Sequence, residues 1–387
     1  MIMMQKCKQR IAKPILWTIF LFACNANSGF SQSQTPDKEQ YRSQLDSTFL
    51  KAKNLCENDS TKSLVSNWIS YANSITSILD EVDLVEKYRH IDFRIELSKA
   101  LNKAINLDKK GEFLHATQNA IAINILEMSN LGLEAMDNAR KHKSIADAER
   151  AIEFLTICLE DYKETGPSQK MVDSYWKEEE LDWKWIRFYK AVCLRMSNKT
   201  SEAEKEYQTL YKIGWTAPIV FLELADLQIK NGKVEDATKT LMMGHEKNNT
   251  DPRIACVLAK IYLQTDQLKK AQAIMKLFMN HRSENVEVAL VTALVYEKKG
   301  DIKKADVFFK ALYKSDAHEV DINRTYAGFL LRRAVISEKT EAEEYAQQAY
   351  NLLAHAVDLS PNNDYIKKEW EEIKVKYPKV YKTENIQ

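Results

Sequence analysis

Alanines recur at a fixed interval in the second half of this 387-residue chain. One series has members 34 residues apart, and a second series with the same interval lies twelve residues before it. The two series are Ala203, Ala237, Ala271 and Ala305, and Ala191, Ala225, Ala259, Ala293 and Ala327. A period of 34 residues is the length of one helix–turn–helix unit in a repeat array. We therefore expect stacked antiparallel helix pairs, an architecture that offers an extended surface to partners and seldom performs chemistry.

Glycine and proline are scarce, and they fall where helices would end or begin. The chain has nine glycines and seven prolines, about 4% of its residues against roughly 12% in average usage. Gly232 and Gly300 lie midway between paired alanines, where a helix has to stop and reverse. Glycine accommodates the left-handed conformation that ends a helix, whereas Asp251-Pro252 supplies a capping aspartate and a first-turn proline. This punctuation predicts an all-α chain with short turns.

The charge balance and the first 31 residues indicate an exported protein without a basic face. The formal net charge is +1, and nucleic-acid binding usually requires a basic patch, so no nucleic-acid partner is expected. Four basic residues precede a ten-residue, mainly apolar run from Ile15 to Cys24, and small residues follow around Ser28 and Ser31. Such a run is too short to span a bilayer but matches a signal peptide. We assign residues 1–31 to a signal peptide and residues 32–42 to a flexible leader, and expect a periplasmic or outer-membrane-associated protein.

A lipid anchor is the alternative fate of this N-terminus. Leu21-Phe22-Ala23-Cys24 resembles a lipobox, in which the cysteine would be lipidated and become the new N-terminus, although Phe22 is larger than the usual residue there. The stretch Gly29-Phe30-Ser31-Gln32-Ser33 resembles exported proteins of the Bacteroidetes. No later segment has 18 continuous apolar residues, so no transmembrane helix is expected in the mature chain.

Residues 43–165 have helical periodicity but lack the alanine grid. The apolar stripes are Ile145, Ala148, Ile152, Leu155, Leu159 and Tyr162, and Phe93, Leu97, Leu101 and Ala104. Spacings of three and four residues place each stripe on one helix face. We expect four to six helices in antiparallel pairs, either as degenerate repeats or as a separate bundle. Thr165-Gly166-Pro167-Ser168 is the expected domain boundary, because Gly-Pro ends a helix.

The alanine grid resembles tetratricopeptide repeats, in which small residues occupy positions 8 and 20 and aromatic residues positions 11 and 24. The unit from Val286 carries, at positions 8, 11, 15, 20 and 24, the residues Ala293, Tyr296, Gly300, Ala305 and Phe309. Units from Lys184, Pro218 and Pro252 keep both alanines, and the unit around Ala327 does so after a ten-residue insertion before Ala349. The resemblance covers 184–361, within an array assigned to residues 175–361. It implies a right-handed superhelix of antiparallel helix pairs with a concave groove.

The recurring alanines also have a direct physical explanation. The two helices of one unit cross closest at positions 8 and 20, where only a small side chain lets the backbones approach. One unit cannot bury its apolar face alone, so neighbouring units stabilise one another. The end of the stack needs a polar cap, which we assign to residues 362–387, a capping helix and tail with Tyr365, Trp370 and Ile373 among many charges.

No catalytic or metal-binding motif is present in the sequence. It lacks His-Glu-x-x-His, Gly-x-Ser-x-Gly and a phosphate-binding Gly-rich loop, so neither an enzyme activity nor a cofactor nor a metal site is expected. The seven histidines are isolated from one another in the sequence, and we expect surface or helix-end positions for them. The cysteines of the mature chain are Cys56, Cys158, Cys193 and Cys256. They form no Cys-x-x-Cys pair, so we interpret them as core residues, with one disulfide in an oxidising compartment as the alternative.

An aromatic cluster opens the array and has two interpretations. Its members are Trp176, Trp183, Trp185, Phe188 and Tyr189. The cluster either packs the N-terminal half onto the first regular unit or forms an exposed platform for a peptide or a sugar.

The resemblance further implies which residues face a partner. In this family, positions 2, 5, 9, 12 and 13 of the first helix line the groove. The candidate groove residues carried over in this way are Trp185, Phe188, Arg195, Leu222, Asp226, Lys230, Arg253, Lys260, Leu290 and Arg324. They mix apolar anchors with both signs of charge, which suits an amphipathic helix or an extended segment. The lysine and asparagine with which some members hold a terminal carboxylate are absent here, so a chaperone-tail function is not supported.

Together these features favour a non-catalytic protein-interaction scaffold in the bacterial cell envelope, which binds a peptide or helix in its groove. The first alternative is a substrate- or glycan-binding envelope lipoprotein, although such proteins are usually longer and carry a loop-rich insert that this chain lacks. The second alternative is an enzyme with its site in residues 40–165, which a cluster of groups with shifted pKa values in a deep pocket there would favour. The sequence does not identify the partner.

Overall fold

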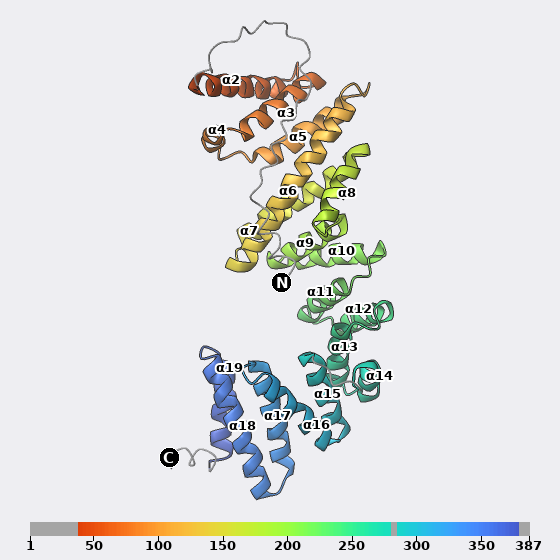
Figure 1. Cartoon of the computed structure of the whole chain (residues 1–387), viewed down its shortest axis with the longest axis vertical. Coiled ribbons are helices and arrows are strands. Elements are labelled where there is room, and N and C mark those ends of the chain that lie inside the picture. Colours follow the sequence, from red (N-terminus) through yellow and green to blue (C-terminus); the bar gives the residue numbers. More distant parts are fainter. Residues whose placement is uncertain (1–37, 280–284, 379–387) are drawn as a thin grey trace. The chain divides into compact units, whose positions relative to one another are not determined.

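The computed structural model describes residues 38–279 and 285–378, and all regular elements in these ranges are helices (Figure 1). This confirms the predicted all-α class. The chain divides into two compact units, Met1–Trp215 and Thr216–Gln387. The assigned signal peptide and the candidate lipid anchor Cys24 lie outside the described residues. Helix α2 begins at Lys38, so the last part of the leader assigned to residues 32–42 is helical rather than flexible coil.

The first unit consists of helices that run back and forth in antiparallel pairs, with α4 as a short connecting helix. They are α2 (Lys38–Glu57), α3 (Val65–Leu79), α4 (Val82–Lys87), α5 (Phe93–Leu107), α6 (Leu114–His142), α7 (Ile145–Asp161), α8 (Gln169–Glu178), α9 (Trp183–Met196) and α10 (Thr200–Lys212), with two short 3-10 turns, η1 (Tyr162–Glu164) and η2 (Gly166–Ser168). Six of these α-helices precede residue 162, as expected. The predicted stripe on α5 is buried along its whole length, from Phe93 to Ala104.

The boundary predicted at residues 165–168 is wrong, because one apolar core continues through it. This core extends from Phe49 to Cys193 and includes Trp176 and Ile186, both 0% exposed. Trp176 stacks on Tyr162 with ring centroids 5.2 Å apart and donates its indole N–H to Ser129 Oγ at 3.3 Å. Trp176, Trp183 and Tyr189 thus pack the N-terminal half onto the first regular unit, as the first interpretation of the aromatic cluster expected. Trp185 and Phe188 contact Trp215 instead. The division falls instead after Trp215, inside the alanine grid.

The second unit continues the array with helix pairs of similar length. Its helices are α11 (Pro218–Lys230), α12 (Val234–Lys247), α13 (Pro252–Gln264), α14 (Leu268–Met279), α15 (Val286–Lys299), α16 (Ile302–Ser315), α17 (Val320–Ile336), α18 (Lys339–Leu359) and α19 (Asp364–Lys376). The chain reverses after α11 and α15 at Gly232 and Gly300, whose φ angles of 74° and 84° require the left-handed region that glycine tolerates. Both turns were predicted from the sequence.

All nine alanines of the grid are 0% exposed. Each pair from α9–α10 to α15–α16 carries one grid alanine on each of its helices, and α17 carries Ala327. Gly244 on α12 likewise lets two helices approach closely, because a Cβ atom at this position would lie 2.8 Å from the side chain of Phe221 on α11. Small side chains therefore mark the helix crossings, as the period predicted.

The last helix pair absorbs the ten-residue insertion by growing longer. Ala327 and Ala349 are 22 residues apart instead of twelve, and the extra residues extend α17 to 17 residues and α18 to 21. A polar turn of two residues, Ser337-Glu338, still connects the two helices. Helix α19 follows as the predicted capping helix, with only Ile366 and Ile373 fully buried.

The four cysteines within the described ranges are buried and carry free thiols. Burial raises the pKa of the Cys56 thiol to about 11 and that of the Cys193 thiol to about 12. They are core residues, and no disulfide joins them, so the disulfide alternative is not realised in this structure.

Candidate binding surface

The candidate groove residues on α11 lie on one side of that helix at intervals of four. Leu222 is half-buried, which leaves part of its aliphatic surface available. Asp226 and Lys230 form an ion pair with an O–N distance of 2.7 Å. Because both side chains are substantially exposed, this pair contributes little to stability, yet it already satisfies the two charges that were candidates for contact with a partner.

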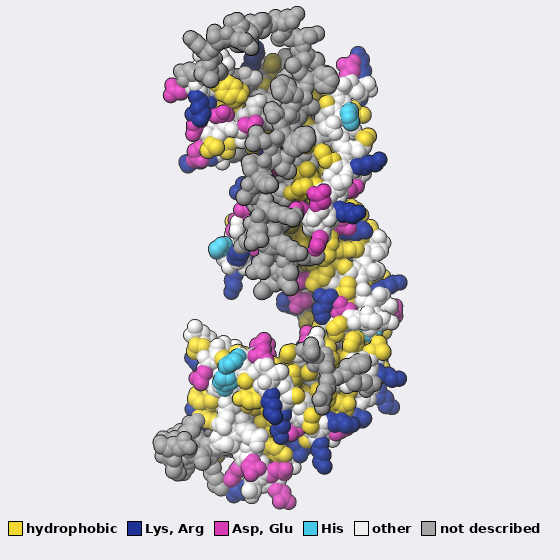
Figure 2. Space-filling view, viewed as in Figure 1, with side chains coloured by type: hydrophobic (Ala, Val, Ile, Leu, Met, Phe, Trp, Pro, Cys, Tyr) yellow, Lys and Arg dark blue, Asp and Glu magenta, His cyan; other side chains and the backbone are white. Residues whose placement is uncertain are grey.

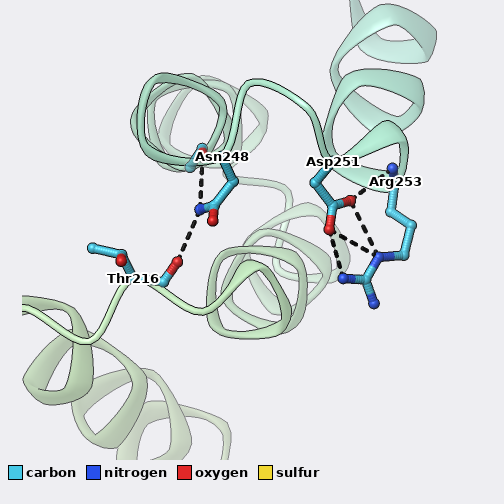
Figure 3. A network of polar contacts seen from close by, with 5 residues as sticks. Thr216, Asn248, Asp251 and Arg253 are labelled. Atoms are coloured by element: carbon cyan, nitrogen blue, oxygen red, sulfur yellow. Dashed lines mark hydrogen bonds and ion pairs between the residues drawn. The ribbon is translucent and has the colours of Figure 1, made fainter. Parts of the chain in front are cut away.

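On α13, Arg253 folds back onto the start of its own helix (Figure 3). Its guanidinium group donates to Asp251, with Nη2–Oδ2 at 2.6 Å, and its backbone N–H donates to Asp251 Oδ1 at 2.9 Å. Partial burial acts to raise the pKa of Asp251, but these hydrogen bonds outweigh it and hold the pKa below its usual value. Arg253 therefore serves as part of a helix cap.

Figure 3 also shows how the end of α12 is tied to a residue that precedes α11 of the same helix pair. Asn248 donates its side-chain amide to the backbone oxygen of Thr216 at 2.8 Å and to that of Gly244 at 3.1 Å. One side chain thus links the last turn of α12, where the carbonyl group of Gly244 also accepts the backbone N–H of Asn248 at 2.9 Å, to the segment before α11.

Ion pairs connect the first helices of successive pairs across the candidate surface. Lys260 on α13 bonds to Glu287 on α15 at 2.9 Å. Arg332 on α17 holds Glu297 on α15 through two hydrogen bonds, of 2.6 and 2.9 Å. These contacts join repeat to repeat, so Lys260, a residue expected to bind a partner, also links two helix pairs of the chain.

The same arrangement recurs at the last unit, where Arg324 on α17 forms a two-bond ion pair with Glu369 on α19. Its Nε and Nη2 atoms lie 2.7 and 3.0 Å from the carboxylate oxygens, and its guanidinium group lies 4.6 Å from the ring centroid of Tyr365. The bond to Glu369 is the largest cause that raises the pKa of Arg324. Leu290, on α15, is half-buried against the core of this part of the unit.

Three candidates lie in the first unit, on α9. Trp185 is half-buried and meets Trp215 edge to face, with ring centroids 4.9 Å apart. Phe188 is only 5% exposed and packs against Trp185, so it offers almost no surface to a partner. Position 5 of this repeat faces the neighbouring helix rather than solvent. Arg195 lies half-buried near the end of the helix.

A hollow of about 550 Å³ lies between α15, α17, α18 and α19. Its apolar lining residues are Leu294, Leu331, Val335, Leu353, Ile373 and Tyr377, and its charged ones are Arg324, Arg332, Glu369, Glu372 and Lys376. A volume of this size is within the range of ligand sites in proteins. Of the candidate groove residues only Arg324 lines it. The signal that would have found it is Gly328, a glycine at groove position 9 of its unit.

The predicted groove therefore differs in character from its expected form. Its charged residues on α11, α13 and α17 are engaged within the chain, whereas Leu222 and Leu290 are half-buried and leave part of their aliphatic surface exposed. On the face in view in Figure 2, hydrophobic side chains are interspersed with charged side chains of both signs. A partner would gain more from the apolar surface than from charges that already have partners.

A buried carboxylate in the first unit was not anticipated. Asp161, at the end of α7, is 1% exposed and accepts hydrogen bonds from Ser98 Oγ at 2.7 Å and Asn102 Nδ2 at 2.6 Å, both on α5. Burial raises its pKa, against the opposing effect of the two hydrogen bonds. Because the group is sealed from solvent, it joins two helices and cannot reach a substrate.

Two histidines that are far apart in the sequence lie close together in the second unit. The ring centroids of His318 and His355 are 5.8 Å apart, although the two residues are isolated from one another in the sequence. Among the described residues, no group of three or more His, Cys, Asp or Glu side chains is placed to hold a metal ion. Within these same ranges, no helix is both long and apolar enough to cross a membrane.

Antiparallel helix pairs with buried alanines at both crossings define an all-α array of helix–turn–helix repeats. No protein-family model and no curated protein matches the sequence. Similar solved structures include a tetratricopeptide repeat protein from Parabacteroides merdae, 13% identical with a TM-score of 0.41, over 64% of this chain and 98% of that one.

Two further similar structures are also tetratricopeptide repeat proteins. YrrB, described as having an unusual peptide-binding site, is 13% identical with a TM-score of 0.36, over 51% of this chain and 96% of its own. The C-terminal part of a repeat-containing protein from Cytophaga hutchinsonii is 15% identical with a TM-score of 0.35, over 67% of this chain and 98% of its own.

Proposed function

We propose that the protein is a non-catalytic interaction scaffold of the bacterial cell envelope, which binds a peptide or a helix along the first helices of its second unit. The observations that carry this proposal are the hollow between α15 and α19, whose lining combines apolar and charged side chains, and the half-buried Leu222 and Leu290 at groove positions. Concave, mainly apolar surfaces with a few polar groups are the usual form of a binding site.

The energetics favour apolar contacts as the source of affinity. Exposed ion pairs contribute about 0–1 kcal/mol each, so a partner that replaces an internal pair such as Lys260–Glu287 with its own charges gains little. Burial of half-exposed side chains such as Leu222 and Leu290 releases water without breaking any bond. We therefore expect the partner to present an apolar stripe, as an amphipathic helix or an extended segment does.

The location in the envelope rests on the N-terminal sequence alone, with its basic start, apolar run and small residues. Cys24 in its lipobox-like context supports the lipid-anchored form as a second candidate. Metabolic labelling with palmitate separates the two forms. Label in the wild-type protein and none in Cys24→Ser would establish an anchor, whereas an unlabelled protein released from the periplasm would establish the unanchored form.

Affinity capture from envelope extracts tests the scaffold function. Bait proteins would be the wild type, Leu222→Ser on the candidate surface, and Met242→Ser as a control. Met242 is 44% exposed on α12, the second helix of the same pair. We expect a protein that the wild type and Met242→Ser retain and Leu222→Ser loses. If all three baits retain the same proteins, the first-helix surface is not the binding face.

A further inference from the structure

We propose that His318 and His355 form a two-histidine site for a divalent transition-metal ion of the Zn²⁺ type. The ion ties the turn between α16 and α17 to the end of α18. This proposal does not depend on the scaffold function, because neither histidine lines the hollow or belongs to the candidate groove. Three observations carry it: the separation of the two rings, their lack of any other polar partner, and a turn that is held in place around one of them.

The course of the last long helix pair brings the two histidines together. His318 lies in the turn that precedes α17, and His355 lies near the end of α18. Because a turn of two residues joins α17 to α18, the beginning of α17 lies beside the end of α18 (Figure 1). Two residues that are distant in the sequence thereby become neighbours on one side of the second unit.

The separation of the rings is close to that of two imidazoles bound to one metal ion. Their centroids are 5.8 Å apart and their planes are tilted by 53°, so the rings are not stacked face to face. With Zn–N distances of about 2.0–2.1 Å and ring centres about 1.2 Å behind the nitrogens, two ligands at a tetrahedral angle have centroids about 5.3 Å apart. Small rotations of the side chains close the remaining gap of about half an ångström, because the outer torsion of histidine is broad.

Both imidazoles are available as ligands. His318 is exposed and His355 is half-buried, so an ion reaches them from solvent. Within residues 38–279 and 285–378, neither ring has a hydrogen bond or an ion pair, and their mutual contact is the one polar or aromatic interaction of either side chain.

The chemistry of the pair selects the kind of ion. Imidazole nitrogen is the commonest protein ligand of transition metals, and it binds Zn²⁺, Ni²⁺ and Cu²⁺ in preference to Mg²⁺ and Ca²⁺, which take oxygen ligands. No third histidine, cysteine or carboxylate of the described residues joins the pair. Water therefore completes the coordination of the ion, and the site is open and exchangeable rather than a closed structural centre.

The turn that carries His318 is fixed by a buried amide. Asn323 on α17 is 0% exposed and donates its side-chain amide to the backbone oxygens of Ala317 at 2.7 Å and Glu319 at 2.8 Å. These two bonds hold the backbone on both sides of His318, while His355 is carried by a packed helix. Ligands on fixed backbone lose little conformational freedom when they bind, which favours the bound state.

The test is isothermal titration calorimetry of the purified protein, prepared without a polyhistidine tag, with ZnCl2 and in parallel with MgCl2. The variants are His318→Ala, His355→Gln and the two substitutions combined. His115→Ala is the matched control, because His115 is an exposed histidine on α6 in the first unit. Thermal unfolding in the absence of added metal verifies that each variant is folded. The four cysteines of the described ranges are buried, so their thiols do not compete for the ion in the folded protein.

We expect a Zn²⁺-binding step in the wild type that Mg²⁺ does not reproduce. Its affinity should fall at least about tenfold in each single variant and change less than about threefold in His115→Ala. Because the two histidines bind the same ion, the combined variant should be no more than about threefold weaker than the weaker single variant.

Four results would overturn the paired site. They are a wild type that binds no Zn²⁺, Mg²⁺ binding of equal strength at the same step, single variants that retain the wild-type affinity, and a loss of affinity in one single variant but not in the other. None of them bears on the capture experiment with Leu222→Ser, so the scaffold function stands or falls separately.

Discussion

Replacing Ala259 by leucine tests the helix crossings that the 34-residue period predicts. Ala259 on α13 and Ala271 on α14 are both 0% exposed, so the isopropyl group that leucine adds has no free space at this crossing. Overpacking of this kind costs about 1–3 kcal/mol. A loss of about 1 kcal/mol lowers the midpoint of thermal unfolding by about 2–4 °C in a domain of 150–250 residues. We therefore expect the second unit of Ala259→Leu to unfold about 2–12 °C below the wild type.

Thermal unfolding followed by far-ultraviolet circular dichroism provides the assay, with Ala273→Leu as the matched control. Ala273 is exposed on α14, two residues beyond Ala271, and a surface substitution of this kind usually changes stability by less than about 0.5 kcal/mol. The reasoning is refuted if Ala259→Leu keeps the wild-type midpoint, or if the control loses as much stability as the buried variant.

Three other substitutions probe single contacts through the free energy of urea unfolding. Asp161→Asn should become more stable relative to the wild type as pH rises above the usual carboxyl pKa. Burial raises the pKa of Asp161 in the folded protein, so ionisation of this carboxyl group destabilises the wild type. That destabilisation is absent below the unfolded-state pKa and complete above the folded-state pKa, and the asparagine variant does not have it. Parallel pH profiles for the two proteins would contradict this. Gly300→Val should lose about 1–3 kcal/mol, because a β-branched residue is strained at a φ of 84°; an unchanged value would mean that the turn relaxes. Asn248→Ala should lose about 1–3 kcal/mol, since it removes the donor to the carbonyl groups of Thr216 and Gly244, and a loss below about 0.5 kcal/mol would show that water replaces the amide.

Local features of the sequence predicted most of the second half of the fold. The alanine period locates the helix crossings because a close backbone approach restricts side-chain size at one position per helix. Gly232 and Gly300 located turns because the left-handed conformation is local to one residue. Asp251 located a helix start because its side chain caps the next turn of backbone. Each of these requirements acts within a few residues, so a single sequence displays it.

Features that depend on distant contacts were missed. The boundary expected at residues 165–168 failed because one core joins Phe49 to Cys193 across it. Arg324 and Glu369 are 45 residues apart, and Lys260 and Glu287 are 27 residues apart, so their pairing follows only from how the helices stack. The hollow likewise requires α19 to lie beside α17, which the sequence of neither helix specifies. The groove rule placed the buried Phe188 on the binding face, and it did not supply the partners that the charged groove residues already have.

Photo-crosslinking in cells that produce the protein tests the binding face most directly. The photoreactive residue p-benzoylphenylalanine would replace Val335, at the lip of the hollow, and in a separate protein Val307 on α16, which is not among the residues that line it. The two valines are matched in residue type and in exposure, 63% and 64%. A binding face at the hollow predicts a crosslinked species of higher mass from position 335 and none from position 307. Adducts from position 307 with none from position 335 would contradict it.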